Sequence, residues 1–230
     1  MPAQFDSKLK AVIDSGTMIT LSSTCLMNVF KSFIEHNRLE LIVPNEVSEE
    51  SVWRPISNKR FSLNAARIKH LLNESLVRVV SSSPQVRTLE DKILYLANNC
   101  FYEKGRPITI IQRGEAEALA LVIMHDARAL FIDERTTRSL IENPIRLRQI
   151  LEKRRQETIT VNKKNIDEIR TMFKDLKMFR SVDIIALAYE QDLFDHELDH
   201  GRLELEAALY ATKFAGCAVS EKEILDYLVP

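Results

Sequence analysis

The sequence is poor in the residues and patterns that mark several large classes of protein. Glycine occurs five times in 230 residues, and neither a Walker A loop nor a G-x-G-x-x-G run is present, so a nucleotide cofactor is not expected. Cys25, Cys100 and Cys217 are odd in number and lack metal-ligand spacing, which predicts buried thiols in a reducing compartment. The longest apolar run, from Ala118 to Met124, is too short to cross a bilayer.

No charge of one sign dominates the chain. Hydrophobic residues make up 45% and charged residues 28%, with a formal net charge of −1, as in soluble globular proteins. A surface that binds phosphates must therefore be local. The N-terminus lacks the charged start and apolar stretch of a signal peptide, so we expect a cytoplasmic chain without membrane contact.

Short apolar runs alternate with amphipathic stretches through residue 133. Strands are expected at residues 10–14, 39–43 and 130–133, with short strands or extended connections at 76–80 and 108–111. Helices are expected over 18–36, 61–74, 88–103 and 115–125. This alternation predicts an α/β fold in which helices flank a mainly parallel central sheet.

The chain beyond residue 140 has mostly helical patterns. Helices are expected over 138–157, 166–179, 182–191 and 196–215, and a capping-box pattern at Ser220 starts a last one that ends near Leu228. We therefore place residues 9–140 in one domain and 141–230 in a helical C-terminal extension. No linker separates the two, so they can also be continuous.

Acidic residues stand at the ends of two predicted strands and at the start of a predicted helix. Asp14 and Asp133 end apolar runs, and Glu115 follows Gly114. In a parallel sheet the active site lies beyond the carboxyl ends of the strands, so we expect these side chains to meet there. Clustered carboxylates need a cation, and oxygen ligands suit Mg²⁺ or Mn²⁺, which can activate water against a phosphate. The pattern predicts a metal-dependent nuclease.

Each carboxylate also has a structural interpretation. Asp14 can cap the helix that follows it, and Glu115 is favourable at a helix start because of the helix dipole. Glu117 competes with Glu115 as a ligand, but it lies two residues on and is expected to face elsewhere. Glu134 can replace or assist Asp133.

Four segments, in this order, resemble the acidic motifs of PIN domains, a ribonuclease family whose fold has a parallel sheet flanked by helices. The segment Val12-Ile-Asp-Ser15 resembles the family's opening strand and its first acidic residue. The second acidic motif is resembled by Val43-Pro-Asn-Glu-Val-Ser-Glu-Glu50, the third by Gly114-Glu115, and the fourth by Ile132-Asp-Glu-Arg-Thr-Thr-Arg138.

The resemblance implies a catalytic set of four carboxylates. Asp14, Glu115 and Asp133 would hold one or two Mg²⁺ or Mn²⁺ ions, with Glu134 as a further metal ligand. Glu50 would bind directly or through water, and Glu49 is its alternative.

The residues around the first aspartate depart from the family. Gly16 stands where PIN domains often have Ser, Thr or Asn, so Ser15 or Thr17 would support Asp14 instead.

The resemblance also implies RNA as the substrate, single-stranded in form. It further implies a toxin of a toxin–antitoxin pair, an antitoxin-like protein partner and a homodimer, although 230 residues is long for such a toxin. A basic cluster that would frame the RNA groove consists of Lys59, Arg60, Arg67 and Lys69. Trp53 and Phe61 flank it and either stack on bases or pack in the core.

Two other functions compete with the nuclease. One is an RNA- or protein-binding module that has the PIN-like fold with weak catalysis or none. The other is a zinc hydrolase, because His196-Glu-Leu-Asp-His200 matches the pattern of two histidines four residues apart on a helix. Asp199 is charged where zinc proteases usually have an uncharged residue, and no third ligand is obvious apart from Glu221 or Glu223.

Overall fold

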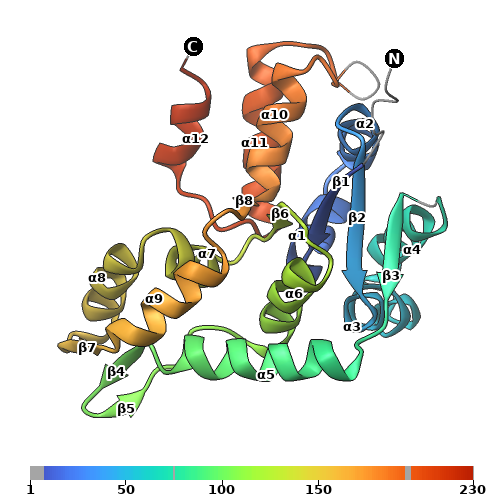
Figure 1. The fold of residues 1–230 in the computed structure, drawn as a ribbon. Helices are drawn as coiled ribbons and strands as arrows, with labels where there is room; N and C mark the ends of the chain where they lie inside the picture. The colour runs from blue at the N-terminus through green and yellow to red at the C-terminus, as the bar shows by residue number, and fades with distance from the viewer. Residues whose placement is uncertain (1–7, 75, 195–197, 230) are drawn as a thin grey trace, which may run out of the picture.

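A five-stranded parallel sheet forms the centre of the protein (Figure 1). The computed structural model describes residues 8–74, 76–194 and 198–229. The strands are β1 (Leu9–Ile13), β2 (Leu39–Pro44), β3 (Val77–Val80), β6 (Ala129–Phe131) and β8 (Lys177–Phe179), in the order β3-β2-β1-β6-β8. All neighbouring strands are parallel, so the expected α/β class with a mainly parallel sheet is confirmed.

The sheet separates two hydrophobic cores because successive side chains of a strand point to opposite faces. Ala11 and Ile13 of β1 belong to one core, and Val12 belongs to the other. The first core is covered by α1 (Ser15–Ser23), α2 (Met27–His36), α4 (Ser62–Asn73), α10 (Ser181–Glu190), α11 (Arg202–Ala215) and α12 (Glu221–Tyr227). The second is covered by α5 (Pro84–Asn98), α6 (Arg113–Met124), α7 (Arg135–Glu142), α8 (Pro144–Arg155) and α9 (Lys163–Met172). Helices on both faces give three layers.

The remaining elements connect these layers. Between β2 and α4 run α3 (Asn45–Ser48), a π-helical turn η1 (Glu49–Trp53) and a 3₁₀ turn η2 (Pro55–Ser57). A small antiparallel sheet, β5-β4-β7, consists of β4 (Phe101–Glu103), β5 (Arg106–Pro107) and β7 (Ile159–Val161). Within the described ranges, no helix has the length and apolar character needed to cross a membrane.

Several element boundaries differ from the sequence prediction. The helix expected over 18–36 is divided into α1 and α2, where the Thr24 hydroxyl bonds to the carbonyl of Leu21 and to the amide of Leu26. For the segment 108–111 the sequence allows a short strand or an extended connection, and the structure has the extended connection, in which the Asn98 side chain accepts hydrogen bonds from the amides of Ile110 and Ile111. Cys100 and Cys217 are buried, but Cys25 is exposed, so its predicted burial is wrong.

The largest difference lies beyond residue 140. The helix expected over 166–179 ends at Met172, and residues 177–179 form β8, which pairs with β6. Pairing with a distant strand overrides the helical pattern of the local sequence. The long helix expected from residue 196 begins only at Arg202. The central sheet therefore continues into the segment beyond residue 140.

A fragment that ends at residue 140 is predicted not to fold as a stable unit. It lacks β8 and the buried side chains of α10 and α11, among them Val182, Ile185 and Leu209, which fill the first core. Helices α1, α2 and α4 still cover part of that face in the fragment, but the part of the first core that α10 and α11 fill is opened to water, and this loss of apolar burial destabilises the sheet. Circular dichroism and urea unfolding of residues 1–140 and of the full chain measure this, and a cooperative transition in the fragment would contradict it.

Candidate functional site

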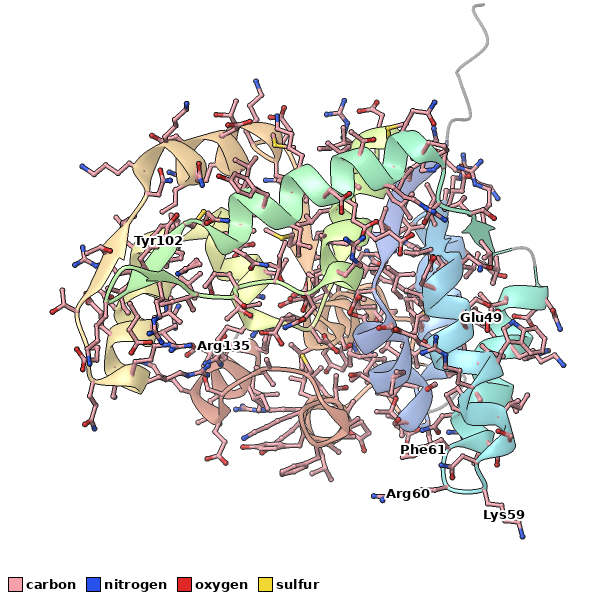
Figure 2. The ribbon with its side chains drawn as sticks, turned by 90° about the horizontal axis from the view of Figure 1, so that it is seen from below. Glu49, Lys59, Arg60, Phe61, Tyr102 and Arg135 are labelled. Atoms are coloured by element: carbon pink, nitrogen blue, oxygen red, sulfur yellow. The ribbon has the colours of Figure 1, made fainter. Side chains whose placement is uncertain are left out.

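The sheet order places two acidic residues at its reversal point. From β1 the chain passes to β2 on one side, whereas β6 lies on the other side of β1. Asp14 directly follows β1, and Asp133 follows β6 by two residues. Ligands of open parallel sheets bind outside the carboxyl ends of strands at such a point. We call this end of β1 and β6 the carboxyl edge. Strand β2, which is parallel to β1, points downward in Figure 1, and Figure 2 shows the molecule from below.

Asp14 caps α1, and its pKa is affected by other charged groups at this edge. Its Oδ2 accepts a hydrogen bond of 2.9 Å from the Gly16 amide. A Cβ at residue 16 would lie 3.1 Å from the same oxygen, so glycine suits this turn. Burial raises the pKa of Asp14, and the charges of Asp133 and Glu50 raise it further. These three predicted site residues are therefore electrostatically coupled.

Asp133 is buried and fully engaged by the start of α10. Its Oδ1 accepts from the Ser181 amide and its Oδ2 from the Ser181 hydroxyl, both at 2.7 Å. Because both oxygens have donors, Asp133 links the end of β6 to α10 and is poorly placed to bind a ligand directly.

Glu115 and Glu134 also cap helices. The Gln112 amide donates to Glu115 in a capping box at the start of α6. Glu134 accepts from the amide and the hydroxyl of Thr136 at the start of α7. Burial raises the pKa of Glu115, the Gln112 amide opposes this, and the charges of Asp14 and Glu134 add to the increase. Glu115 and Glu134 therefore act as helix caps, and the pKa of Glu115 shows that the negative charges of Asp14 and Glu134 lie close to it.

A cavity of about 330 Å³ opens beside Asp14 and is lined by residues from four segments of the chain. We call it the acidic cavity, because its lining includes the carboxylates of Asp14, Glu46, Glu50, Glu90 and Glu117. Ser15, one of the predicted supports of Asp14, also lines it. Of the predicted alternatives, Glu50 lines the cavity and Glu49 does not; Glu115, Asp133 and Glu134 are likewise not part of the lining.

Glu117 is one of several cavity residues that the sequence does not predict; Ser82, Arg87 and Glu90 are others. Helical spacing predicts that Glu117 faces away from the site, but it is buried and the Ser82 hydroxyl donates to it. Burial raises its pKa to about 7; the Ser82 bond opposes this, and the nearby Glu46 carboxyl favours protonation. The useful signal was the spacing of Gln112 and Glu115, since a capping box occupies Glu115 and leaves Glu117 for the cavity.

The cations at this cavity have different partners. Arg113 binds Glu90 at 2.6 Å and Asp91 at 2.8 Å. Arg87 is exposed and, in the part of the chain that the structure describes, forms no ion pair. Arg87 is therefore the cavity cation that can bind an anion without breaking an existing pair.

Three buried hydroxyls lie on the segments that carry the acidic residues. Thr17, Ser51 and Thr137 have no hydrogen-bond partner for their side-chain oxygens among the described residues. Thr17 lies three residues after Asp14 and Ser51 directly follows Glu50. A buried hydroxyl that is left unsatisfied costs about 1–3 kcal/mol. The prediction that Thr17 supports Asp14 is therefore not matched by a hydrogen bond between their side chains.

The oxygen ligands at the carboxyl edge suit a hard divalent cation, but in this structure they are too far apart to coordinate one ion together. Carboxylate and hydroxyl oxygens are the ligands that Mg²⁺ and Mn²⁺ prefer. Within residues 8–74, 76–194 and 198–229, no three His, Cys, Asp or Glu side chains are grouped closely enough to hold a metal ion. Binding therefore requires the longer side chains, such as Glu50 and Glu117, to change rotamer.

The predicted basic cluster does not act as one unit. Arg67 donates to the Ser22 carbonyl at 2.8 Å, which is a structural contact. Lys69 lies 5.2 Å from the ring centre of Trp53, and Arg60 lies 5.4 Å from that of Phe61. Lys59 is exposed and extends outward with Arg60 and Phe61 in Figure 2.

Trp53 and Phe61 are 51% and 45% exposed. The alternative that these two aromatic residues pack in the core is therefore wrong. Their rings, each with a cation nearby, remain accessible to a ligand.

The histidine pattern is only partly described. His196 and Glu197 lie outside the described residues. His200 precedes α11, stacks on Tyr189 with ring centres 4.0 Å apart, and lies 3.2 Å from Asp192. The expectation that a helix carries both histidines is wrong at His200, because the helix begins at Arg202.

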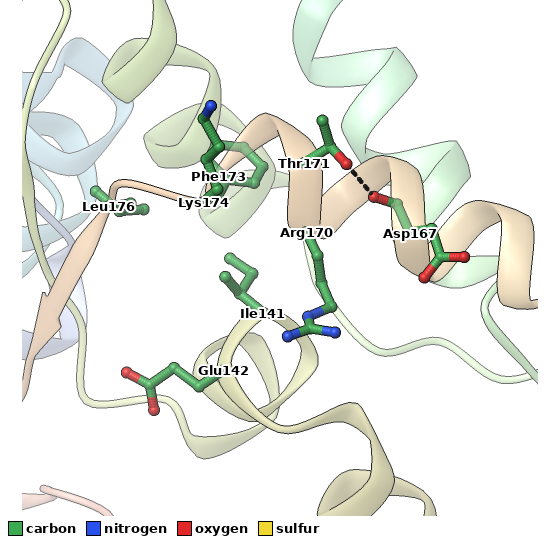
Figure 3. A pocket seen from close by; sticks show the side chains of 8 residues that line it. All are labelled: Ile141, Glu142, Asp167, Arg170, Thr171, Phe173, Lys174 and Leu176. Carbon is green, nitrogen blue, oxygen red and sulfur yellow. Dashed lines mark hydrogen bonds between the residues drawn. The ribbon is translucent and has the colours of Figure 1, made fainter.

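A larger cavity, of about 570 Å³, lies between α7 and α9 (Figure 3). It is lined by Ile141, Glu142, Asp167, Arg170, Thr171, Phe173, Lys174 and Leu176. It shares no lining residue with the acidic cavity. Its size alone gives no chemical reason to prefer it as a catalytic site.

Glu117→Gln is predicted to change the pH dependence of stability. The pKa of Glu117 is about 7 in the folded protein against an ordinary 4.5. The stability that protonated Glu117 contributes is therefore fully present below the ordinary value and is lost as pH rises through 7. The variant should be more stable than the parent at pH 8, by about 1–2 kcal/mol, with little difference at pH 5. Urea unfolding at both pH values measures this, and equal differences would contradict it.

Comparisons of the chain with protein-family models, with curated proteins and with solved structures found no match. The chemistry of the carboxyl edge must therefore be judged from its own residues. These residues are a capped aspartate, a buried glutamate with a raised pKa, an exposed glutamate and an arginine without an ion-pair partner among the described residues.

Proposed function

We propose that this chain is a divalent-metal-dependent endoribonuclease with a PIN-like active site, acting in the cytoplasm. The observation that carries the proposal is the convergence of carboxylates from separate segments on one cavity at the reversal point of a parallel sheet. Burial and nearby negative charge raise the pKa of Asp14 and Glu117 in the cavity, and also that of Glu115, which lies outside the lining but is affected by the charge of Asp14. A cation would relieve this repulsion.

We assign two roles to the acidic residues of the site: some carboxylates in the cavity would bind the metal ion, and Asp133, outside the cavity, would position other groups. Asp14, Glu50 and Glu117 would hold Mg²⁺ or Mn²⁺, with Glu46 beside them. When bound, the ion supplies a water of lowered pKa and neutralises charge on the phosphate. Arg87 would bind a phosphate oxygen. Asp133 would act as a positioning residue, because it fixes the start of α10 and contributes negative charge at Asp14.

Single-stranded RNA is the substrate that the neighbouring surface favours. Trp53 and Phe61 expose their rings in the segments that follow Glu50, and unpaired bases stack on exposed aromatic rings. Arg60 and Lys69, each near one of these rings, would add attraction to the backbone. A toxin role with an antitoxin-like partner extends this proposal, and neither is needed for the chemistry.

The metal-site experiment follows cleavage of labelled single-stranded RNA while Mn²⁺ is titrated. Asp14→Asn, Glu50→Gln and Glu117→Gln should each reduce cleavage about 100-fold or more. Asparagine still caps a helix, so Asp14→Asn should remain folded. Glu49→Gln and Asp126→Asn are matched controls, since both residues are exposed and neither lines the cavity. Equal activity of the parent and Asp14→Asn would exclude the proposed site.

The stacking surface is tested by RNA affinity in Ca²⁺ or EDTA, where cleavage does not interfere. Trp53→Ala and Phe61→Ala should each weaken binding by about 1–3 kcal/mol. Tyr95→Ala is the control, because Tyr95 is also exposed but lies on α5. If all three variants bind RNA as the parent does, RNA does not use this surface.

A binding module without catalysis is the second candidate. It is favoured by the capping bonds, which occupy oxygens of Asp14, Glu115 and Glu134, and by the absence of a grouped metal site among the described side chains. Tight RNA binding in Mn²⁺ without any cleavage, together with no change in melting temperature on adding Mn²⁺ at pH 8, would support this candidate over the nuclease.

A further inference from the structure

Helix α11 has apolar side chains on two opposite faces. One face consists of Leu205, Ala208, Leu209 and Thr212, which are buried against the first core. The other consists of Leu203, Ala207, Tyr210 and Phe214, which we call the outer stripe. At 3.6 residues per turn the two sets point in opposite directions. A helix that packs on one side needs only a single apolar face. Tyr210 is partly buried at the edge of the first core, but the rings and methyl groups of the stripe that stay exposed have no packing partner outside α11 among the described residues.

The outer stripe is accessible and has the spacing of a helix-pairing seam. Leu203 is 73% and Phe214 is 79% exposed, Ala207 is exposed, and Tyr210 is partly exposed. The steps between them are four, three and four residues, the repeat that places side chains along one seam between two helices. Tyr210 and Phe214 already stack, with ring centres 6.1 Å apart.

The flanking charges indicate which partner fits. Glu206 and Lys213 border the stripe on the same side of the helix, because seven residues are close to two full turns. In an antiparallel pair of α11 helices related by a two-fold axis, Leu203 faces the partner's Phe214 and Ala207 faces the partner's Tyr210. The same arrangement brings Glu206 next to the partner's Lys213, twice. Identical helices in this register are therefore complementary in both shape and charge.

We infer that a second copy of this chain covers the outer stripe, through an antiparallel α11–α11 contact. Lys213 lies 3.2 Å from Glu221 of its own chain and over the rings of Tyr210 and Phe214, so its ammonium group is held at the edge of the stripe. Glu206 forms no ion pair within the described ranges. The contact does not involve the acidic cavity, and it stands or fails independently of the proposed nuclease.

The first test measures the mass of the full chain by sedimentation velocity over a range of concentrations. The parent should form a dimer, and Phe214→Glu should raise its dissociation constant at least about tenfold by burying a charge in the seam. Ile145→Glu is the matched control, because Ile145 is 72% exposed on α8 and far from the stripe in sequence. A parent that stays monomeric at its highest soluble concentration overturns the inference.

The second test establishes the register. Glu206→Lys and Lys213→Glu should each weaken the dimer several-fold, whereas the double variant should restore it, since each pair then has opposite charges again. Circular dichroism of each variant confirms that the chain is folded. A dimer that neither Phe214→Glu nor the single charge reversals weaken forms through another surface, and this also overturns the inference.

Discussion

The negative charge that converges on the carboxyl edge is the constraint on which the rest of this structure depends. Four carboxylates there stand at the starts of helices: Asp14 at α1, Glu115 at α6, Glu134 at α7 and Asp133 at α10. Backbone amides at a helix start carry partial positive charge and stabilise such groups. The repulsion that remains is visible in the raised pKa values of Asp14 and Glu115. The fold itself therefore neutralises only part of this charge.

Capping and catalysis make different demands on a carboxylate. A cap must hold its oxygen against a backbone amide, as Asp133 does with Oδ1, while its Oδ2 accepts from the Ser181 hydroxyl. A ligand must be able to turn an oxygen toward the ion, and Glu50, which is exposed and lines the cavity, is placed to do so. Because Asp133 joins β6 to α10, a change there alters packing and charge together, whereas changes at Glu50 or Glu117 act mainly on the cavity.

The segment beyond residue 140 completes the sheet and one core, and it also presents a second apolar surface. Strand β8 extends the sheet next to β6. Buried Arg180 donates to Asp183, Glu223 and Tyr227, which fastens α12 to the start of α10. The inner face of α11 is held separately, by the packing of Leu205, Ala208 and Leu209 in the first core, so its outer stripe can face outward without loosening that core. The acidic cavity and this stripe are built from different elements, so each can change without the other.

Local pattern determined the class of fold and the positions of its acidic residues. Alternation of short apolar runs with helical periodicity predicted the parallel sheet, and the strand ends at Asp14 and Asp133 predicted their convergence, because parallel strands share one carboxyl edge. Only tertiary structure decided that residues 177–179 form a strand, since that strand exists through pairing with β6. It also decided that Glu117 and Glu50 enter the cavity while Glu115 and Asp133 are held as caps. Asp133 and Glu117 are oriented by donors far away in the sequence, from Ser181 and Ser82, and the residues near these two carboxylates do not contain this information.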